Sequence, residues 1–232
     1  MKCKRLLTLV LPTAVILSAC QRVLATDFQP SSTVALSNDV ENYHQIVTVK
    51  AETTLDQNET AVSYTATEAT LFLDETIGYG SRITKGTDIS SHKVNMYSSP
   101  SRAYQQTNQE DWQPVATTSP LFSSLEVYPY ETFLEMAEIF IQNGTVAESE
   151  EEFLITYSGK DEALNREIAA ALEKMPAANT SYEVSLSVDK ESQHLTSFSL
   201  ITETEQADGN RIVTQELTSS FSKYNQNTPK PF

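Results

Sequence analysis

Cysteine and basic residues are both scarce in this chain. The two cysteines, Cys3 and Cys20, lie near the amino terminus, so no disulfide framework can hold the following residues together. The 16 Lys and Arg residues face 31 Asp and Glu residues, giving a net charge of −15. Nucleic-acid binding and electrostatic docking on anionic lipid both need a cationic surface, so this balance argues against either kind of partner.

Motifs typical of enzymes are also missing from the sequence. Gly78 to Ser81 holds glycines and a serine without the G-x-S-x-G spacing of a nucleophile elbow. His44, His92 and His194 are far apart, and none belongs to an H-E-x-x-H pair. The acidic run from Glu148 to Glu152 is more typical of a solvated loop or strand edge than of a metal site. We therefore expect no enzymatic activity, no cofactor and no metal.

One long apolar run is present, at the amino terminus. Lys2, Lys4 and Arg5 precede Leu6–Ala19, a stretch of 14 mostly apolar residues. As a helix, this stretch would rise about 21 Å, against a hydrocarbon core of about 30 Å. A basic head, a short apolar core and small residues are typical of a secretory signal rather than of a membrane span.

The end of this run, Leu17-Ser18-Ala19-Cys20, resembles the lipobox of bacterial prolipoproteins. The resemblance implies a signal peptide over residues 1–19, cut before Cys20, whose thiol carries a lipid. Cleavage removes three basic residues and no acidic ones, which leaves 13 against 31 and a net charge of −18. Attachment then depends on acyl chains such as palmitate, which hold the protein on the extracytoplasmic face of the cell membrane. The alternative is an ordinary secretory signal cut after Ala25.

The remaining sequence divides by its periodicity. Residues 20–42 are polar and mostly aperiodic, which predicts a lipid anchor followed by a flexible tether. Residues 43–227 fit a single domain, and residues 228–232 form a short tail. From Tyr43 onward the dominant period is two, as in strands with one buried face. The apolar parity changes between residues 66 and 69, which predicts a β-bulge there.

Two segments have the period of a helix instead. In Tyr128 to Gln142, apolar residues recur at i, i+3, i+4 and i+7, and Asn143-Gly144 forms a natural stop. Lys160 to Met175 shows the same spacing, with acidic residues near its start. Strands before and after these helices predict an α+β fold. We expect a large curved antiparallel sheet, a half-open barrel, with about two helices covering its concave face.

A second resemblance rests on element order and a few aromatic positions. These are Arg102-Ala103-Tyr104 before Asp111-Trp112, a helical insert, the strand Val184–Lys190 and the closing Phe221–Asn225. This pattern resembles a group of poorly characterised Gram-positive lipoproteins, which are similar to the LolA, LolB and LppX superfamily of lipid-binding envelope proteins. The resemblance implies a half-open barrel over about residues 43–227, with helices over its concave face. It supplies no catalytic motif.

Two non-enzymatic functions follow. The first is binding of a lipid or other apolar ligand between the helices and the sheet, lined by Phe133, Phe140, Leu186 and Phe198. The second is a protein-interaction or sensor module at the cell envelope, with a protein partner that the sequence does not identify. An apolar cavity of about 300 Å³ or more favours the ligand. A filled core with an exposed apolar patch favours the partner.

Overall fold

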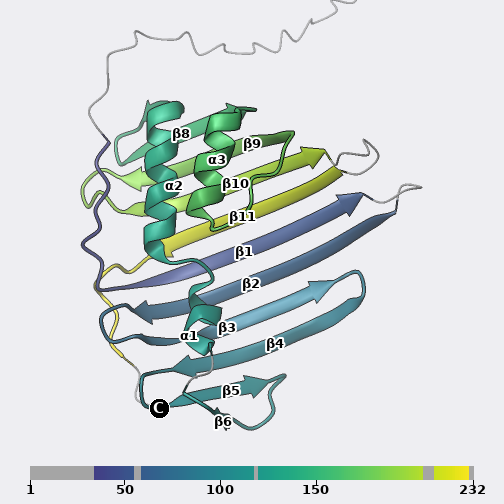
Figure 1. The fold of residues 1–232 in the computed structure, drawn as a ribbon. Coiled ribbons are helices and arrows are strands. Elements are labelled where there is room, and N and C mark those ends of the chain that lie inside the picture. Colours follow the sequence, from purple (N-terminus) through teal and green to yellow (C-terminus); the bar gives the residue numbers. More distant parts are fainter. Residues whose placement is uncertain (1–33, 55–58, 118–119, 206–211, 230–232) are drawn as a thin grey trace, which may run out of the picture. The chain divides into compact units, whose positions relative to one another are not determined.

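One antiparallel sheet of eleven strands accounts for most of the fold (Figure 1). The computed structural model describes residues 34–54, 59–117, 120–205 and 212–229. These residues belong to one compact unit, Thr33–Phe232, which contains the whole described sheet and hydrophobic core. A unit with its own complete core is able to fold independently.

The sheet is open, with β6 and β7 at its two edges. The strand order is β6-β5-β4-β3-β2-β1-β11-β10-β9-β8-β7, and every neighbouring pair is antiparallel. The strands are β1 (Asn42–Thr54), β2 (Thr60–Phe72), β3 (Ile77–Gly86), β4 (Ile89–Ser98), β5 (Ala103–Thr107), β6 (Gln113–Val115), β7 (Thr145–Glu148), β8 (Glu152–Gly159), β9 (Thr180–Asp189), β10 (Leu195–Glu205) and β11 (Ile212–Ser222). The first strand, β1, pairs with the last, β11, near the centre of the sheet. This pairing joins residues that are far apart in sequence.

The helices all lie on one face of the sheet (Figure 1). They are α1 (Leu121–Glu126), α2 (Tyr130–Asn143) and α3 (Glu162–Ala171). The α+β class, the curved antiparallel sheet and the two longer helices confirm the predicted architecture. A Cβ at Gly144 would lie 2.7 Å from the carbonyl oxygens of Phe140 and Thr156, so only glycine fits where α2 meets β8.

Two parts of the fold go beyond the prediction. A short hairpin, β7–β8, separates α2 from α3, so the helices are not consecutive. The acidic run forms its turn, where the Ser149 backbone N–H donates to the Glu152 carbonyl at 2.9 Å, and the Lys190 ammonium binds Glu148. The six-residue α1 was not predicted either; it contacts β2, β3 and β4.

The predicted bulge between residues 66 and 69 is wrong. The pairing of β2 with β1 runs without interruption from Thr60 to Phe72. The apolar parity changes because the buried face changes along the strand. Ala69 and Leu71 are buried on the face that carries α1, whereas Tyr64 is half-buried on the opposite face. The register shifts lie instead between Thr84 and Gly86, in the pairing of β3 with β4, and between Leu195 and Ser197, in the pairing of β10 with β9.

Residues 34–41 were assigned to the tether but pack on the domain. Val34 is buried, and Leu36 and Val40 contact the core. The Asn225 side chain accepts from the Glu41 backbone N–H at 2.7 Å and donates to the Asp39 carbonyl at 2.9 Å. The folded unit therefore begins before the first strand.

Candidate functional site

The strongest candidate site lies beside α3, on the helix-covered face of the sheet. Asp161 starts the helix by accepting from the backbone N–H groups of Ala163 at 2.7 Å and Leu164 at 3.0 Å. On the sheet side, the Tyr182 hydroxyl donates to the Asn165 side chain. Burial raises the pKa of this phenol, so it stays neutral and remains a donor. These bonds fix the helix over β9.

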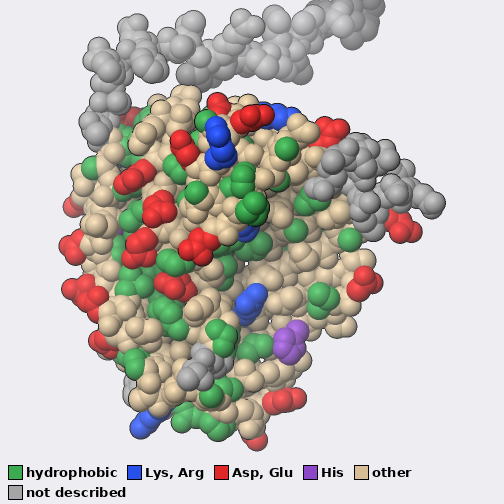
Figure 2. Space-filling view, viewed as in Figure 1, with side chains coloured by type: hydrophobic (Ala, Val, Ile, Leu, Met, Phe, Trp, Pro, Cys, Tyr) green, Lys and Arg blue, Asp and Glu red, His purple; other side chains and the backbone are tan. Residues whose placement is uncertain are grey.

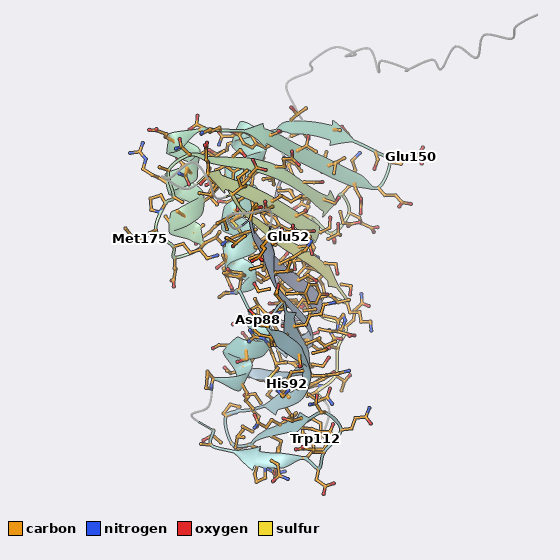
Figure 3. All side chains as sticks on the ribbon, turned by 90° about the vertical axis from the view of Figure 1, so that its right-hand side faces the viewer. Glu52, Asp88, His92, Trp112, Glu150 and Met175 are labelled. Carbon is orange, nitrogen blue, oxygen red and sulfur yellow. The ribbon has the colours of Figure 1, made fainter. Side chains whose placement is uncertain are left out.

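The chain after α3 is held in the same way. Asn165 donates its amide to the Ala177 carbonyl at 2.7 Å, and the Thr180 hydroxyl donates to the same oxygen at 2.9 Å. The loop between α3 and β9 thus turns back along the helix. Met175 lies on this loop and is 90% exposed; Figure 3 shows it at the outer side of the helices.

A pocket of about 110 Å³ opens between α3, this loop and the sheet. The helix and the loop contribute Ile168, Ala169, Leu172, Lys174 and Met175, among others. The sheet contributes Val49, Leu200, Leu217, Thr202, Thr204, Gln215 and Tyr182, and Tyr128 closes one side. Val49 pairs with Leu217, and Leu217 with Leu200, so three neighbouring strands supply one apolar floor.

Acidic side chains gather over the helices on this face (Figure 2). Glu131, Glu135, Glu138, Glu162 and Glu167 are all exposed on α2 and α3. Glu126 at the end of α1 differs because it is largely buried. Burial and the nearby Glu131 raise the pKa of its carboxyl to about 7. The outer surface of the helices is therefore anionic.

A polar row crosses the same sheet face beside the pocket. Arg82, Thr67, Val47 and Ser219 are direct neighbours on β3, β2, β1 and β11. The Arg82 Nε, the Thr67 hydroxyl and the Ser219 hydroxyl are buried and have no hydrogen-bond partner among the described residues. Sequence reasoning missed this row, because only the strand register brings its residues together.

The described residues offer little catalytic chemistry. They contain no group of three His, Cys, Asp or Glu side chains arranged to hold a metal ion. His44 and Glu68 lie 3.7 Å apart on the opposite face of the sheet. Burial lowers the pKa of this histidine, which favours its neutral form. In the part of the chain that the structure describes, no helix is long and apolar enough to cross a membrane.

A family of unknown function, DUF6612, matches residues 31–228, which include every described strand and helix and the pocket. The chain belongs to this family. No curated protein matches it. The DUF6612 description gives no activity, so the resemblance to the LolA, LolB and LppX superfamily stays a prediction. Cys20 precedes the DUF6612 match and lies outside the described residues.

The four residues predicted to line a ligand site are fully buried in the core of the DUF6612 domain. Phe133, Phe140 and Leu186 are 0% exposed and Phe198 is 1% exposed. The Phe133 and Phe198 rings meet edge to face with centroids 5.6 Å apart. These side chains therefore join α2 to β9 and β10, whereas other residues line the pocket beside α3.

Proposed function

We propose that this DUF6612 protein is an exported lipoprotein whose domain binds a lipid or other apolar ligand in the pocket beside α3. The supporting observation is the pocket itself, where Ile168 and Leu172 of the helix face Val49, Leu200 and Leu217 of the sheet. Apolar surface left in water costs about 25 cal/mol per Å². An aliphatic group in the pocket would remove such surface from water.

The volume of the pocket limits what fits inside. Drug-sized ligands occupy about 300 Å³ or more, whereas an apolar cavity of about 150 Å³ holds a benzene-sized molecule. At about 110 Å³, the pocket is smaller than the cavity of about 300 Å³ expected for an enclosed ligand, so it takes a short aliphatic segment and not a whole lipid. The rest of the ligand then lies along the open sheet face beside α3, where β1–β4 extend beyond the helices (Figure 1).

A filling substitution tests this proposal. Thr202 lines the pocket from β10 and is half-buried, and a phenylalanine there would occupy the space. We expect Thr202→Phe to weaken binding of a fluorescent fatty acid by at least about tenfold in the Thr33–Phe232 unit. Ile201→Phe is the matched control, because its side chain lies on the opposite face of the same strand. Equal affinity in both variants and the parent would reject the pocket.

The membrane part of the proposal depends on Cys20. Replacing it by alanine in the full chain should abolish incorporation of labelled palmitate and release the protein from the membrane fraction, or leave the precursor uncut. Membrane retention of the Cys20→Ala chain after a cut at Ala25 would contradict lipid attachment at this residue.

A protein-interaction module is the second candidate function. It is favoured by the filled core around Phe133 and Phe140 and by Met175, whose side chain is exposed beside a pocket of side-chain size. In this alternative, an apolar side chain of a partner enters the pocket. Saturable fatty-acid binding that Thr202→Phe removes favours the ligand, whereas absence of any such binding favours the partner.

A further inference from the structure

A row of cross-strand neighbours joins the helix-covered core to the open part of the same sheet face. Arg82 pairs with Thr67, Thr67 with Val47, and Val47 with Ser219. Side chains of directly paired residues lie on the same face. The row continues from Ser219 to Phe198, whose ring contacts Phe133 of α2. Arg82 therefore lies on the face that carries the helices.

The polar side-chain atoms of this row lack hydrogen-bond partners within the described ranges. Thr67 is 0% exposed and Ser219 is 5% exposed, and neither hydroxyl has a hydrogen-bond partner in the described chain. The Arg82 Nε is buried and also has no partner in the part of the chain that the structure describes. Buried polar groups are nearly always paired, because an unpaired one costs free energy. Of the three residues, only Arg82 is half-exposed, so it is the one that a polar ligand can reach.

The charge of Arg82 adds to this observation. The chain has 31 acidic residues and 16 basic ones, so acidic partners are plentiful. The ion pairs within the described ranges nevertheless involve His44, Lys50 and Lys190, and not Arg82. A half-buried guanidinium without a carboxylate suits a planar anion, because its fork of N–H donors matches carboxylate and phosphate oxygens.

The apolar pocket begins one step further along the strands. The next row of the same face contains Thr65, Val49, Leu217 and Leu200, and the last three line the pocket floor. Val49 on β1 is two strands across the sheet from Arg82 on β3, and two residues further along the strand direction than the row of Arg82. This offset places their Cα atoms roughly 12 Å apart. A ligand with its chain in the pocket therefore has its other end near Arg82.

We propose that the pocket and this row form one amphipathic site, in which Arg82 binds the anionic head of a ligand whose aliphatic chain occupies the pocket. This inference rests on the proposed function and names its ligand class: a single-chain amphiphile with a carboxylate or phosphate head. The net charge of −15 disfavours small free anions, so the aliphatic chain is needed for binding.

The test compares a fluorescent polyene fatty acid with its uncharged methyl ester, both titrated into the Thr33–Phe232 unit. The unmodified unit should bind the acid about tenfold or more tightly than the ester, as expected for a charge-assisted pair. Arg82→Gln should lower acid affinity to that of the ester and leave ester affinity unchanged. Arg82→Lys should retain part of the preference. Lys85→Gln is the control, because Lys85 is an exposed cation on the same strand but on the opposite face, over the Tyr64 ring. Lys174→Gln tests the exposed cation that lines the pocket.

Competing ligands identify the head group. Dodecanoate and dodecyl phosphate should each displace the acid, and the stronger competitor shows which head the site prefers. Dodecanol should compete weakly, and inorganic phosphate should not compete. Displacement by inorganic phosphate alone would show a separate anion site and overturn the joint one.

The remaining outcomes separate the two proposals. Equal affinity of the unmodified unit for acid and ester overturns the Arg82 head-group site but leaves the apolar pocket standing. Absence of saturable binding for either probe overturns both. Loss of the acid preference in Lys174→Gln but not in Arg82→Gln also overturns the assignment to Arg82. If Arg82→Gln does not fold, the acid-to-ester ratio of the unmodified unit and of Arg82→Lys still decides.

Discussion

The side-chain amide of Gln45 donates to the backbone carbonyl oxygen of Leu125 at 3.0 Å, and so joins the first strand to the end of the first helix. The same nitrogen also donates to the Glu126 carbonyl at 3.0 Å, and the side chain is fully buried. These are carbonyls at the end of α1, a helix of only six residues that lacks a side-chain hydrogen bond at its N-cap. Gln45 therefore holds this end of α1 on the sheet.

Gln45→Met should lower the free energy of unfolding by about 1–3 kcal/mol, because buried carbonyls lose their donor. Urea unfolding of the Thr33–Phe232 unit measures the change. Gln113→Met provides the control, since Gln113 is exposed on the edge strand β6. Equal stabilities of the two variants would show that the bond to Leu125 contributes nothing.

The raised pKa of Glu126 predicts a pH dependence of stability. The folded protein holds the carboxyl proton up to a pKa of about 7, against an ordinary value of 4.5. The stabilisation is therefore complete below pH 4.5 and is lost as pH rises through about 7. Because part of the carboxyl is solvated, we expect a loss of about 1–2 kcal/mol from this group.

Glu126→Gln should remove this part of the pH dependence and make the variant more stable than the parent at pH 8. Thermal or urea unfolding from pH 5 to pH 8 measures the effect. Glu135→Gln serves as a control, because Glu135 is exposed on α2. A stability that still falls with pH in Glu126→Gln, as it does in the parent, would assign the effect to another group.

The segment before β1 should contribute to stability. Val34 is buried and Leu36 and Val40 pack on the core, so a unit that begins at Asn42 loses about 2 kcal/mol or more. For a domain of this size, that lowers the melting temperature by about 4–8 °C. Calorimetry of units beginning at Thr33 and at Asn42 compares the two. An unchanged melting temperature would show that residues 34–41 do not stabilise the domain and act as part of the tether.

Substitution of Phe140 tests whether this residue belongs to the hydrophobic core or lines a ligand site. Its side chain is fully buried against Tyr157, with ring centroids 5.7 Å apart. Phe140→Ala should cost about 3–5 kcal/mol of unfolding free energy. Because Phe140 lies outside the pocket beside α3, fatty-acid affinity should be unchanged under conditions where the variant is folded. Weaker fatty-acid binding with little loss of unfolding free energy would instead show that Phe140 lines the ligand site.

Much of this fold is predictable from the sequence, because its elements satisfy local rules. The alternation of Tyr182, Val184, Leu186 and Val188 predicts one buried face of β9, and the structure confirms it. The register pairs Leu186 with Phe198 and Val184 with Leu200, so β10 shares that face. The helical spacing of Phe133, Met136, Ala137 and Phe140 places all four in the core, as their periodicity predicts.

The elements that escaped prediction depend on contacts distant in sequence. Helix α1 has six residues and no capping side chain, and its place over Gly78 and Leu71 stabilises it. Likewise, the polar row through Arg82 follows from strand pairing alone: Arg82 and Ser219 are 137 positions apart, and no local pattern relates them. The pocket beside α3 is also non-local, because the loop through Ala177 forms one of its walls.

Photo-crosslinking tests the central claim, an apolar ligand beside α3, most directly. A fatty acid with a diazirine near its tail end is bound to the Thr33–Phe232 unit, irradiated and mapped by mass spectrometry. We predict adducts on the peptides that contain Ile168, Leu172 and Leu200, and their loss when unlabelled fatty acid is added in excess. Adducts spread over the surface, or adducts that excess fatty acid does not reduce, would contradict the pocket as the ligand site.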